Sequence, residues 1–240
     1  MNNVRTVSDT KRNFYTVHTR PINSIYRRVV EELMVEMHLL SVNVDFHYDP
    51  IYALGVVSSF DRFMQGYRPE QDKVSIFNAL CQALGADPQK YRQDAEQLKT
   101  LATQVSAQEL ISPTGQLSSL EGGQALQETL QAIAASSKFK YSRLFAIGLF
   151  TILELADPEM VKDEKQRTEF LKQVGATLHL PEDKVQKDLE LYRSNLEKMA
   201  QAQAAMEDIL NADRKQREQR AQAKSEAAIA DAPRDEAPSA

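Results

Sequence analysis

The chain is poor in the residues that carry covalent or metal chemistry. Its 240 residues include no Trp and a single cysteine, Cys81. One cysteine excludes an intramolecular disulfide and a cysteine-rich zinc site, and it suits a reducing compartment. Cys81 falls on the apolar side of a predicted helix, so we expect it to be a buried and unreactive thiol.

The chain also lacks a long apolar segment. Its longest near-unbroken apolar run, Leu144 to Leu153, is far shorter than the ~20 residues that a membrane-spanning helix needs. The first residues, MNNVRTVSDTKRN, contain no apolar core of a secretory signal, and they include Asp9, which is atypical of a transit peptide. We therefore expect a soluble or peripheral protein without a targeting segment.

Catalytic and nucleotide-binding motifs are absent as well. The sequence contains neither GxGxxG, HExxH nor GxSxG, nor a GxxxxGK followed by Ser or Thr. No Glu is followed three places later by His, which excludes the di-iron site of some helical bundles. A net charge of −5 argues against a general nucleic-acid binder. We expect no enzymatic activity, no cofactor and no nucleic-acid partner.

One short cluster of metal-capable groups stands in the sequence, Asp45-x-His47-x-Asp49. In the reading that we favour, Asp49 caps a helix that begins at Pro50, His47 lies in a tight interhelical turn, and no metal is bound. His38, beside an apolar stripe, is expected to be a partly buried hydrogen-bonding residue.

The chain does contain a regular series of helix signals. Three Asp-Pro pairs, at 49–50, 87–88 and 157–158, each precede an amphipathic segment. Pro is tolerated at the first helical position, and an Asp before it can cap the helix. Further helices are expected to open at Pro21, Pro69 and Pro181.

Between these signals the spacing of apolar residues is helical. Ser142 to Ala156 is apolar on all sides, which is typical of a helix at the centre of a bundle. Residues 111–123 contain Gly, Ser and Pro and are expected to form a loop. No segment shows the alternation of a β-strand, so the expected fold class is all-α, with about seven helices before the C-terminal segment.

The C-terminal segment differs from the rest. After Pro181 and up to about Ala228 there is no Gly or Pro, and apolar residues follow a heptad seam from Val185 to Leu210. We expect a compact helical bundle and a long C-terminal helix that docks to about Leu210 and projects beyond it. The predicted regions are an N-terminal arm (1–19), the bundle (20–180), the long helix (181–228) and a disordered tail (229–240).

Charged residues in three places are candidates for contacts with other molecules. Asp61 and Arg62 interrupt an apolar helix, where they could form a solvated polar stripe, pair within the helix or meet a partner. The N-terminal arm, which could be extended, has a positive balance that suits anionic lipid. The candidate partner contacts are Asp61, Arg62, Arg214, Arg217 and Arg220, and the candidate membrane contacts are Arg5, Lys11 and Arg12.

Three stretches of the sequence resemble one family. They are TVSDTKRNFYTVHTRPINSIYRRVVEELMVEMHLLSVNVDFHYDPIYALGVVSSFDRFMQGY (Thr6 to Tyr67), FKYSRLFAIGLFTILELA (Phe139 to Ala156) and DEKQRTEFLKQVGATLHLP (Asp163 to Pro181). In these stretches the chain resembles the thylakoid-formation family of cyanobacteria and chloroplasts.

The resemblance implies a non-catalytic auxiliary factor in photosystem II biogenesis and repair and in thylakoid membrane organisation. It implies a peripheral, partly soluble protein on the cytoplasmic (in plastids, stromal) face of the thylakoid membrane. The implied partner is the thylakoid FtsH protease complex, whose accumulation or stability the protein would support by binding, with photosystem II components as further partners. The alternative is a lipid- or pigment-binding module in which the Ser142 to Ala156 helix lines a pocket.

Overall fold

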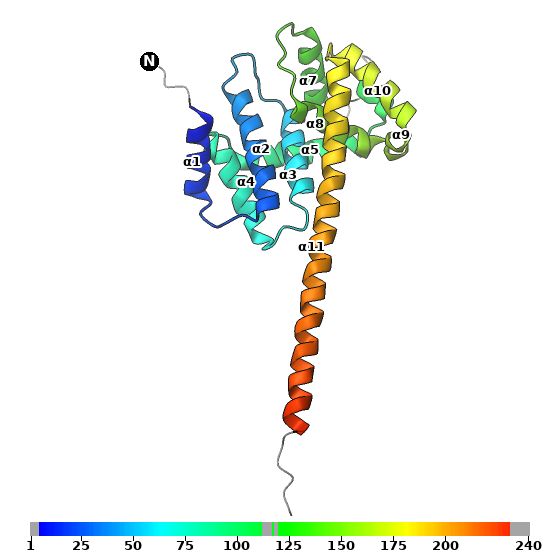
Figure 1. Cartoon of the computed structure of the whole chain (residues 1–240). Helices are drawn as coiled ribbons and strands as arrows, with labels where there is room; N and C mark the ends of the chain where they lie inside the picture. Colours follow the sequence, from blue (N-terminus) through cyan, green and yellow to red (C-terminus); the bar gives the residue numbers. More distant parts are fainter. Residues whose placement is uncertain (1–4, 112–116, 118–119, 231–240) are drawn as a thin grey trace, which may run out of the picture. The chain divides into compact units, whose positions relative to one another are not determined.

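The computed structural model describes residues 5–111, 117 and 120–230, and no strand occurs among them (Figure 1). The predicted all-α class is confirmed. By contact the chain divides into two compact units, Met1–Leu196 and Glu197–Ala240. The helices are α1 (Val7–Val17), α2 (Ser24–Ser41), α3 (Pro50–Phe63), α4 (Gln71–Ala83), α5 (Pro88–Ala102), α6 (Ala107–Ile111), α7 (Gly123–Ala135), α8 (Arg143–Ala156), α9 (Pro158–Lys162), α10 (Glu164–Thr177) and α11 (Glu182–Ala230).

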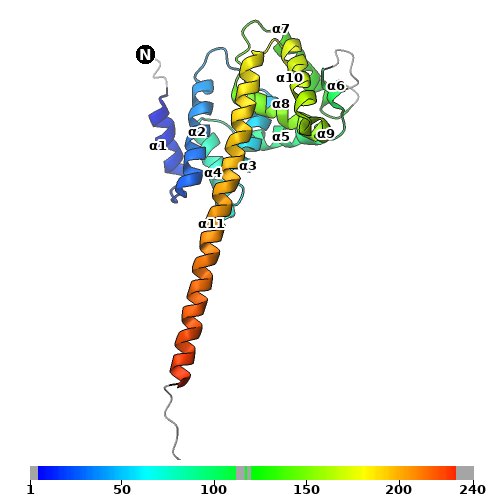
Figure 2. The same ribbon diagram turned by 45° about the vertical axis from the view of Figure 1, so that its right-hand side comes forward.

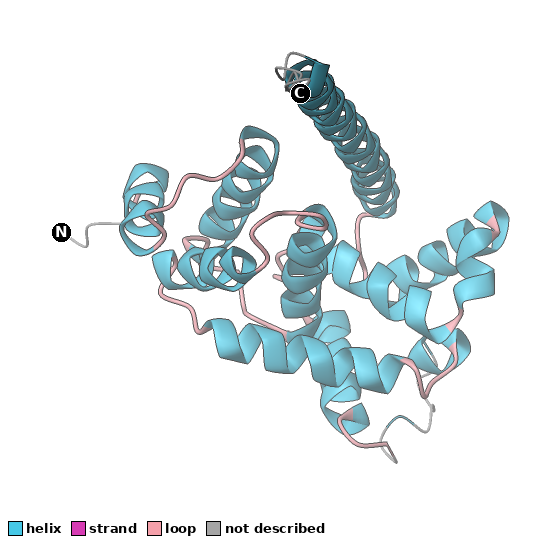
Figure 3. Cartoon of the chain, turned by 90° about the horizontal axis from the view of Figure 1, so that it is seen from below, coloured by secondary structure: helices cyan, strands magenta, loops and turns pink. Residues whose placement is uncertain are grey.

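The first unit is organised around the pair α3 and α8. α3 packs against α8 and α5, and every residue of α3 from Ile51 to Phe60 is buried. Figure 3 shows the described segments as helices joined by loops. Gly55 of α3 and Gly148 of α8 meet where the two helices cross. A Cβ atom on Gly148 would lie 1.9 Å from the carbonyl oxygen of Ile51. Glycine is therefore required here, because the two backbones touch.

The Asp-Pro pairs begin helices as predicted. Asp49, Asp87 and Asp157 each accept a hydrogen bond from a backbone N–H of the first turn of α3, α5 and α9. Pro21 and Pro69, however, do not open helices. α2 begins at Ser24 and is capped by the side chain of Asn23, while α4 begins at Gln71.

Val7–Val17 of the predicted N-terminal arm form the helix α1, which corrects the extended conformation that we considered for the arm. The Thr6 side chain accepts from the Asp9 N–H, and the Asp9 carboxylate accepts from the Thr6 N–H, so a complete capping box starts α1. Phe14 is fully buried, and α1 packs against α4 and α2. The arm therefore belongs to the folded body of the first unit.

α11 is one continuous helix that ends at Ala230, two residues after the predicted end (Figure 2). Val185, Leu189 and Tyr192 are buried within the first unit, as the heptad seam predicts. The continuation of the seam to Leu210 belongs to the second unit, and its docking stays a prediction. Residues 231–240, most of the predicted tail, lie outside the described residues, as does most of the predicted loop 111–123.

The short helix α6 was not expected, because five residues are too few to show a helical period. The start of α9 was predicted by the Asp157–Pro158 pair, but not that this helix would end after five residues.

Candidate partner-binding groove and apolar pocket

The neighbouring charges Asp61 and Arg62 bind to different helices. The Asp61 carboxylate accepts from the Arg92 guanidinium of α5 at 2.7 Å. Arg62 pairs with Glu154 of α8, and its Nη1 lies 3.5 Å from the Tyr192 hydroxyl of α11. The interpretation as a pair within one helix is therefore wrong. The two residues join α3 to three other helices, and their role as partner contacts stays a prediction.

The basic residues near the N-terminus are also engaged within the chain. Arg5 donates to the carbonyl oxygen of Ala83 at 3.0 Å, and Lys11 pairs with Glu31 at 3.0 Å. Arg12 lies 3.8 Å from Asp9 on the same helix. Their contact with a membrane stays a prediction, but it would start from a helix with paired charges and not from a free arm.

The predicted contacts on α11 lie in the second unit. Arg214 pairs with Glu218 one turn later at 3.5 Å, an ordinary pair along a helix surface. Arg217 and Arg220 belong to the same stretch of α11. A partner for these three arginines stays a prediction.

The cluster Asp45, His47 and Asp49 has the conformation that we favoured. Asp49 caps α3, and His47 Nδ1 lies 3.1 Å from the carbonyl oxygen of Asp45. Among the described residues, no group of three or more His, Cys, Asp and Glu side chains could hold a metal ion. His38 is buried and bonds to Thr10 Oγ1 at 2.8 Å, as expected of a hydrogen-bonding histidine. Cys81 is buried, and its burial raises the pKa of the thiol to about 12.

An open groove of about 870 Å³ lies between α2, the start of α8 and the start of α11. We call it the α2–α11 groove. All its lining residues belong to the first unit. The lining residues are Ser24, Arg27, Arg28, Glu31, Glu32, Val35, Glu36, Leu39 and Leu40 of α2, Tyr141, Ser142 and Arg143 at the start of α8, and Lys184 and Asp188 of α11.

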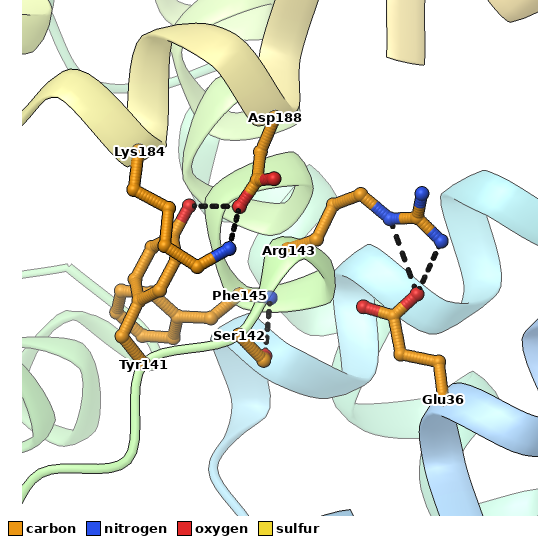
Figure 4. Close-up of polar contacts among 7 residues, drawn as sticks. All are labelled: Glu36, Tyr141, Ser142, Arg143, Phe145, Lys184 and Asp188. Atoms are coloured by element: carbon orange, nitrogen blue, oxygen red, sulfur yellow. Dashed lines mark hydrogen bonds and ion pairs between the residues drawn. The ribbon is translucent and has the colours of Figure 1, made fainter. Parts of the chain in front are cut away.

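Charged contacts hold the groove's three walls together (Figure 4). Arg143 donates to the Glu36 carboxylate through Nε at 3.1 Å and also through Nη2, which ties α8 to α2. Asp188 of α11 accepts from the Tyr141 hydroxyl and from Lys184, each at 2.9 Å. Burial, together with the Asp188 charge, raises the pKa of Tyr141, so this phenol remains a donor. The groove is thus formed before any partner arrives.

Two apolar side chains are left uncovered in this groove. Val35 is 37% exposed and Leu39 is 57% exposed. Arg28 and Glu32 form an exposed ion pair on the same helix. Counted from Arg28 as position i, Glu32, Val35 and Leu39 stand at i+4, i+7 and i+11, so the four side chains share one face of α2. That spacing is the signal in the sequence that marks an apolar patch on the otherwise polar side of α2. The sequence analysis did not predict this patch, because the larger buried apolar stripe of α2 dominates the helical pattern.

A second hollow, the α7–α10 pocket, has a volume of about 220 Å³. It lies between α7, α8 and α10 within the first unit. Its lining residues are Leu117, Leu126, Gln127, Leu130, Gln131, Ala134, Leu149, Ile152, Leu153, Phe170, Leu171, Val174, Thr177 and Leu178. Leu149, Ile152 and Leu153 of the segment Ser142 to Ala156, which the alternative function places along a ligand pocket, line this hollow, and the binding of a ligand stays a prediction. No lining residue carries a charge.

The described residues thus define an all-α protein with a charged groove and an apolar pocket on its first unit. None of the helices described is both long enough and apolar enough to cross a membrane.

Comparison with known proteins gives the family. A family model described as Thylakoid formation protein matches residues 6–221. Protein Thf1 of Nostoc punctiforme is 67% identical over 222 residues, which cover 92% of this chain and 94% of that protein. Protein Thf1 of Acaryochloris marina is 59% identical over 218 residues, which cover 91% and 88% of the two chains. The solved structure of Psb29 at 1.55 Å resembles this one with a TM-score of 0.77 and 45% identity, over 89% of this chain and 98% of that one.

The chain belongs to the thylakoid formation protein family, as its sequence led us to expect. Its role is accordingly in thylakoid formation and photosystem II biogenesis.

Proposed function

We propose that this protein is a non-catalytic auxiliary factor for the biogenesis and repair of photosystem II. It supports the accumulation or stability of thylakoid FtsH protease complexes by binding a protein partner in the α2–α11 groove. It works as a peripheral, partly soluble protein on the cytoplasmic face of the thylakoid membrane. Family membership and the resemblance described above support the pathway, and the groove supports the mode of action.

The observation that carries the mode of action is the exposed pair Val35 and Leu39 inside a charged rim. Apolar side chains in the middle of a patch, with charged residues around them, are the usual composition of a protein interface. Arg28, Glu32 and Lys184 provide charge of both signs on that rim, which selects a partner segment with complementary charges. The ion pair between Arg143 and Glu36 keeps the walls fixed, so little ordering is needed on binding.

The test is a charge placed at the centre of the groove. Val35→Arg should reduce co-purification of thylakoid FtsH by about tenfold or more, because a buried cation in an apolar contact is strongly unfavourable. The matched control is Val74→Arg, since Val74 is also an exposed helical valine, 64% exposed on α4, and does not line the groove. Both variants should melt like the natural protein.

Two results would contradict the proposal. Equal recovery of FtsH with Val35→Arg and with the natural protein would remove the groove from the partner interface. If a chain truncated after Leu210 loses FtsH while Val35→Arg keeps it, the binding site lies instead on the α11 segment that carries Arg214, Arg217 and Arg220. Recovery of photosystem II after strong light, measured in the same strains, connects binding to repair.

A second candidate function, a lipid- or pigment-binding module, is favoured by one observation, the α7–α10 pocket. Ligand pockets for drug-sized molecules usually measure ~300–1,000 Å³. At about 220 Å³ this pocket is smaller, so it suits one hydrocarbon chain better than a pigment macrocycle.

A further inference from the structure

The α7–α10 pocket is enclosed by apolar side chains that the protein withdraws from solvent. Leu126, Ile152, Leu153 and Phe170 are each 5% exposed or less, yet they border a hollow of about 220 Å³. A cavity of ~150 Å³ with walls of Leu, Ile and Phe stays dry and takes up benzene. The pocket therefore has room for an apolar group larger than a benzene ring, and its walls do not favour water.

The polar groups of the lining are neutral. Gln127, Gln131 and Thr177 are the lining residues that can form hydrogen bonds through their side chains, and none of the three is buried. Amide and hydroxyl groups can both donate and accept, so they match an uncharged head group that bears hydroxyls. A carboxylate or phosphate would find no cationic side chain in the lining, and removing it from water without one is costly.

We propose that the α7–α10 pocket binds a single hydrocarbon chain that carries an uncharged, hydrogen-bonding head group. The chain lies against α8 and α10, and the head group lies near Gln131 and Thr177. This ligand class has two sources, the acyl chain of a glyceride and the isoprenoid chain of an alcohol. The proposal rests on the second candidate function described above and not on the α2–α11 groove, and its test uses no protein partner.

The test compares three probes on the purified full-length chain: monopalmitoylglycerol, phytol and palmitate. Native mass spectrometry gives the stoichiometry, and displacement of a fluorescent apolar dye gives the affinity. We expect saturable binding of one molecule per chain for monopalmitoylglycerol or phytol, and at least about tenfold weaker binding of palmitate at neutral pH. The stronger of the two neutral probes identifies the source.

A matched pair of variants locates the site. Ala134→Phe places a ring in the pocket from α7 and should weaken binding of the neutral probe by about tenfold or more. Ala132→Phe makes the same change at an exposed position of the same helix that does not line the pocket, and it should leave binding unchanged. Leu149→Phe enters the pocket from α8 and should repeat the effect of Ala134→Phe, which separates occlusion from damage to α7.

Three outcomes would overturn the inference. They are the absence of saturable binding for both neutral probes, palmitate binding as tight as theirs, and equal affinities of the natural protein and both pocket variants. Circular dichroism of every variant must show natural helix content, so that a loss of binding is not a loss of fold.

Discussion

The two faces of α8 are packed in opposite ways. Toward α3, Gly148 brings the helix so close that a Cβ would lie 1.9 Å from a carbonyl oxygen of its neighbour. Toward α7 and α10, Leu149 is only partly buried and lines a hollow of about 220 Å³. The sequence of this helix, apolar on every side, does not distinguish the two faces. Apolar composition thus marks surface that avoids water, whether a neighbouring helix or a pocket lies against it.

The largest loss of stability is expected where Gly55 of α3 and Gly148 of α8 cross. Gly148→Ala places a methyl group against the backbone of α3, which cannot yield as a side chain could. We expect a loss of more than about 3 kcal/mol in the free energy of unfolding, a large part of the ~5–15 kcal/mol that is typical of a domain. Urea denaturation followed by circular dichroism measures it.

The matched change on the pocket side of α8 is Gly175→Ala in α10, where an added Cβ would meet nothing within 4 Å. Because Ala favours a helix over Gly by about 0.5–1 kcal/mol, this variant should be more stable than the natural protein. If both alanine variants shift the unfolding free energy alike, the two sides do not differ in packing.

A pair of leucines on α8 sharpens the comparison. Leu144 is 1% exposed and lies one turn before Gly148, whereas Leu149 borders the pocket. Leu144→Ala should cost about 2–5 kcal/mol. Leu149→Ala should cost only about 1–2 kcal/mol, because part of that side chain is already free of contacts. Equal losses in urea melts would mean that the pocket is filled by packing in solution.

The smallest effect is expected at a polar interface distant from α8. His18, at the end of α1, is buried, and its Nδ1 lies 3.0 Å from Ser75 Oγ of α4. Burial lowers the pKa of His18, and the nearby Arg20 lowers it further, although Asp72 opposes both. The folded protein therefore holds the neutral ring, while the unfolded chain takes up a proton near its ordinary pKa of about 6.5.

The neutral His18 ring therefore stabilises the folded state, and this stabilisation is complete above about pH 6.5. It is lost as the pH falls from about 6.5 through the lowered pKa of His18 in the folded state. His18→Gln should flatten the fall in stability between about pH 7 and pH 5. A slope unaffected by His18→Gln would show that this ring is not held neutral.

Signals within a single helical turn of the sequence predicted where some of the helices begin. The Asp-Pro pairs predicted three helix starts, since Asp49, Asp87 and Asp157 cap within their own first turns. α1 was missed because its buried side includes polar residues. Thr10 is buried against His38, 28 residues away, and His18 against Ser75, 57 residues away. No local period reveals partners at such distances.

The candidate sites were predictable only in part. The apolar α8 indicated a pocket wall, but not that α7 and α10 would supply the other walls. The α2–α11 groove joins Glu36, Arg143 and Asp188, which are far apart in the sequence and have no motif in common. Asp61 and Arg62 were predicted as partner contacts, which stays a prediction. Their ion-pair partners Arg92 and Glu154 lie on other helices, so sequence spacing could not reveal them.

The crossing of Gly55 with Gly148 also has a consequence for the order of events during synthesis. The two glycines are separated by nearly half of the first unit, so this contact closes a long loop and forms late. A nascent chain that has emerged only as far as α5 offers α3, with its buried run from Ile51 to Phe60, the helices α2, α4 and α5 to pack against, but not α8. Until α8 leaves the ribosome, the apolar side of α3 that packs on α8 is uncovered, and this interval is when a chaperone protects the chain best.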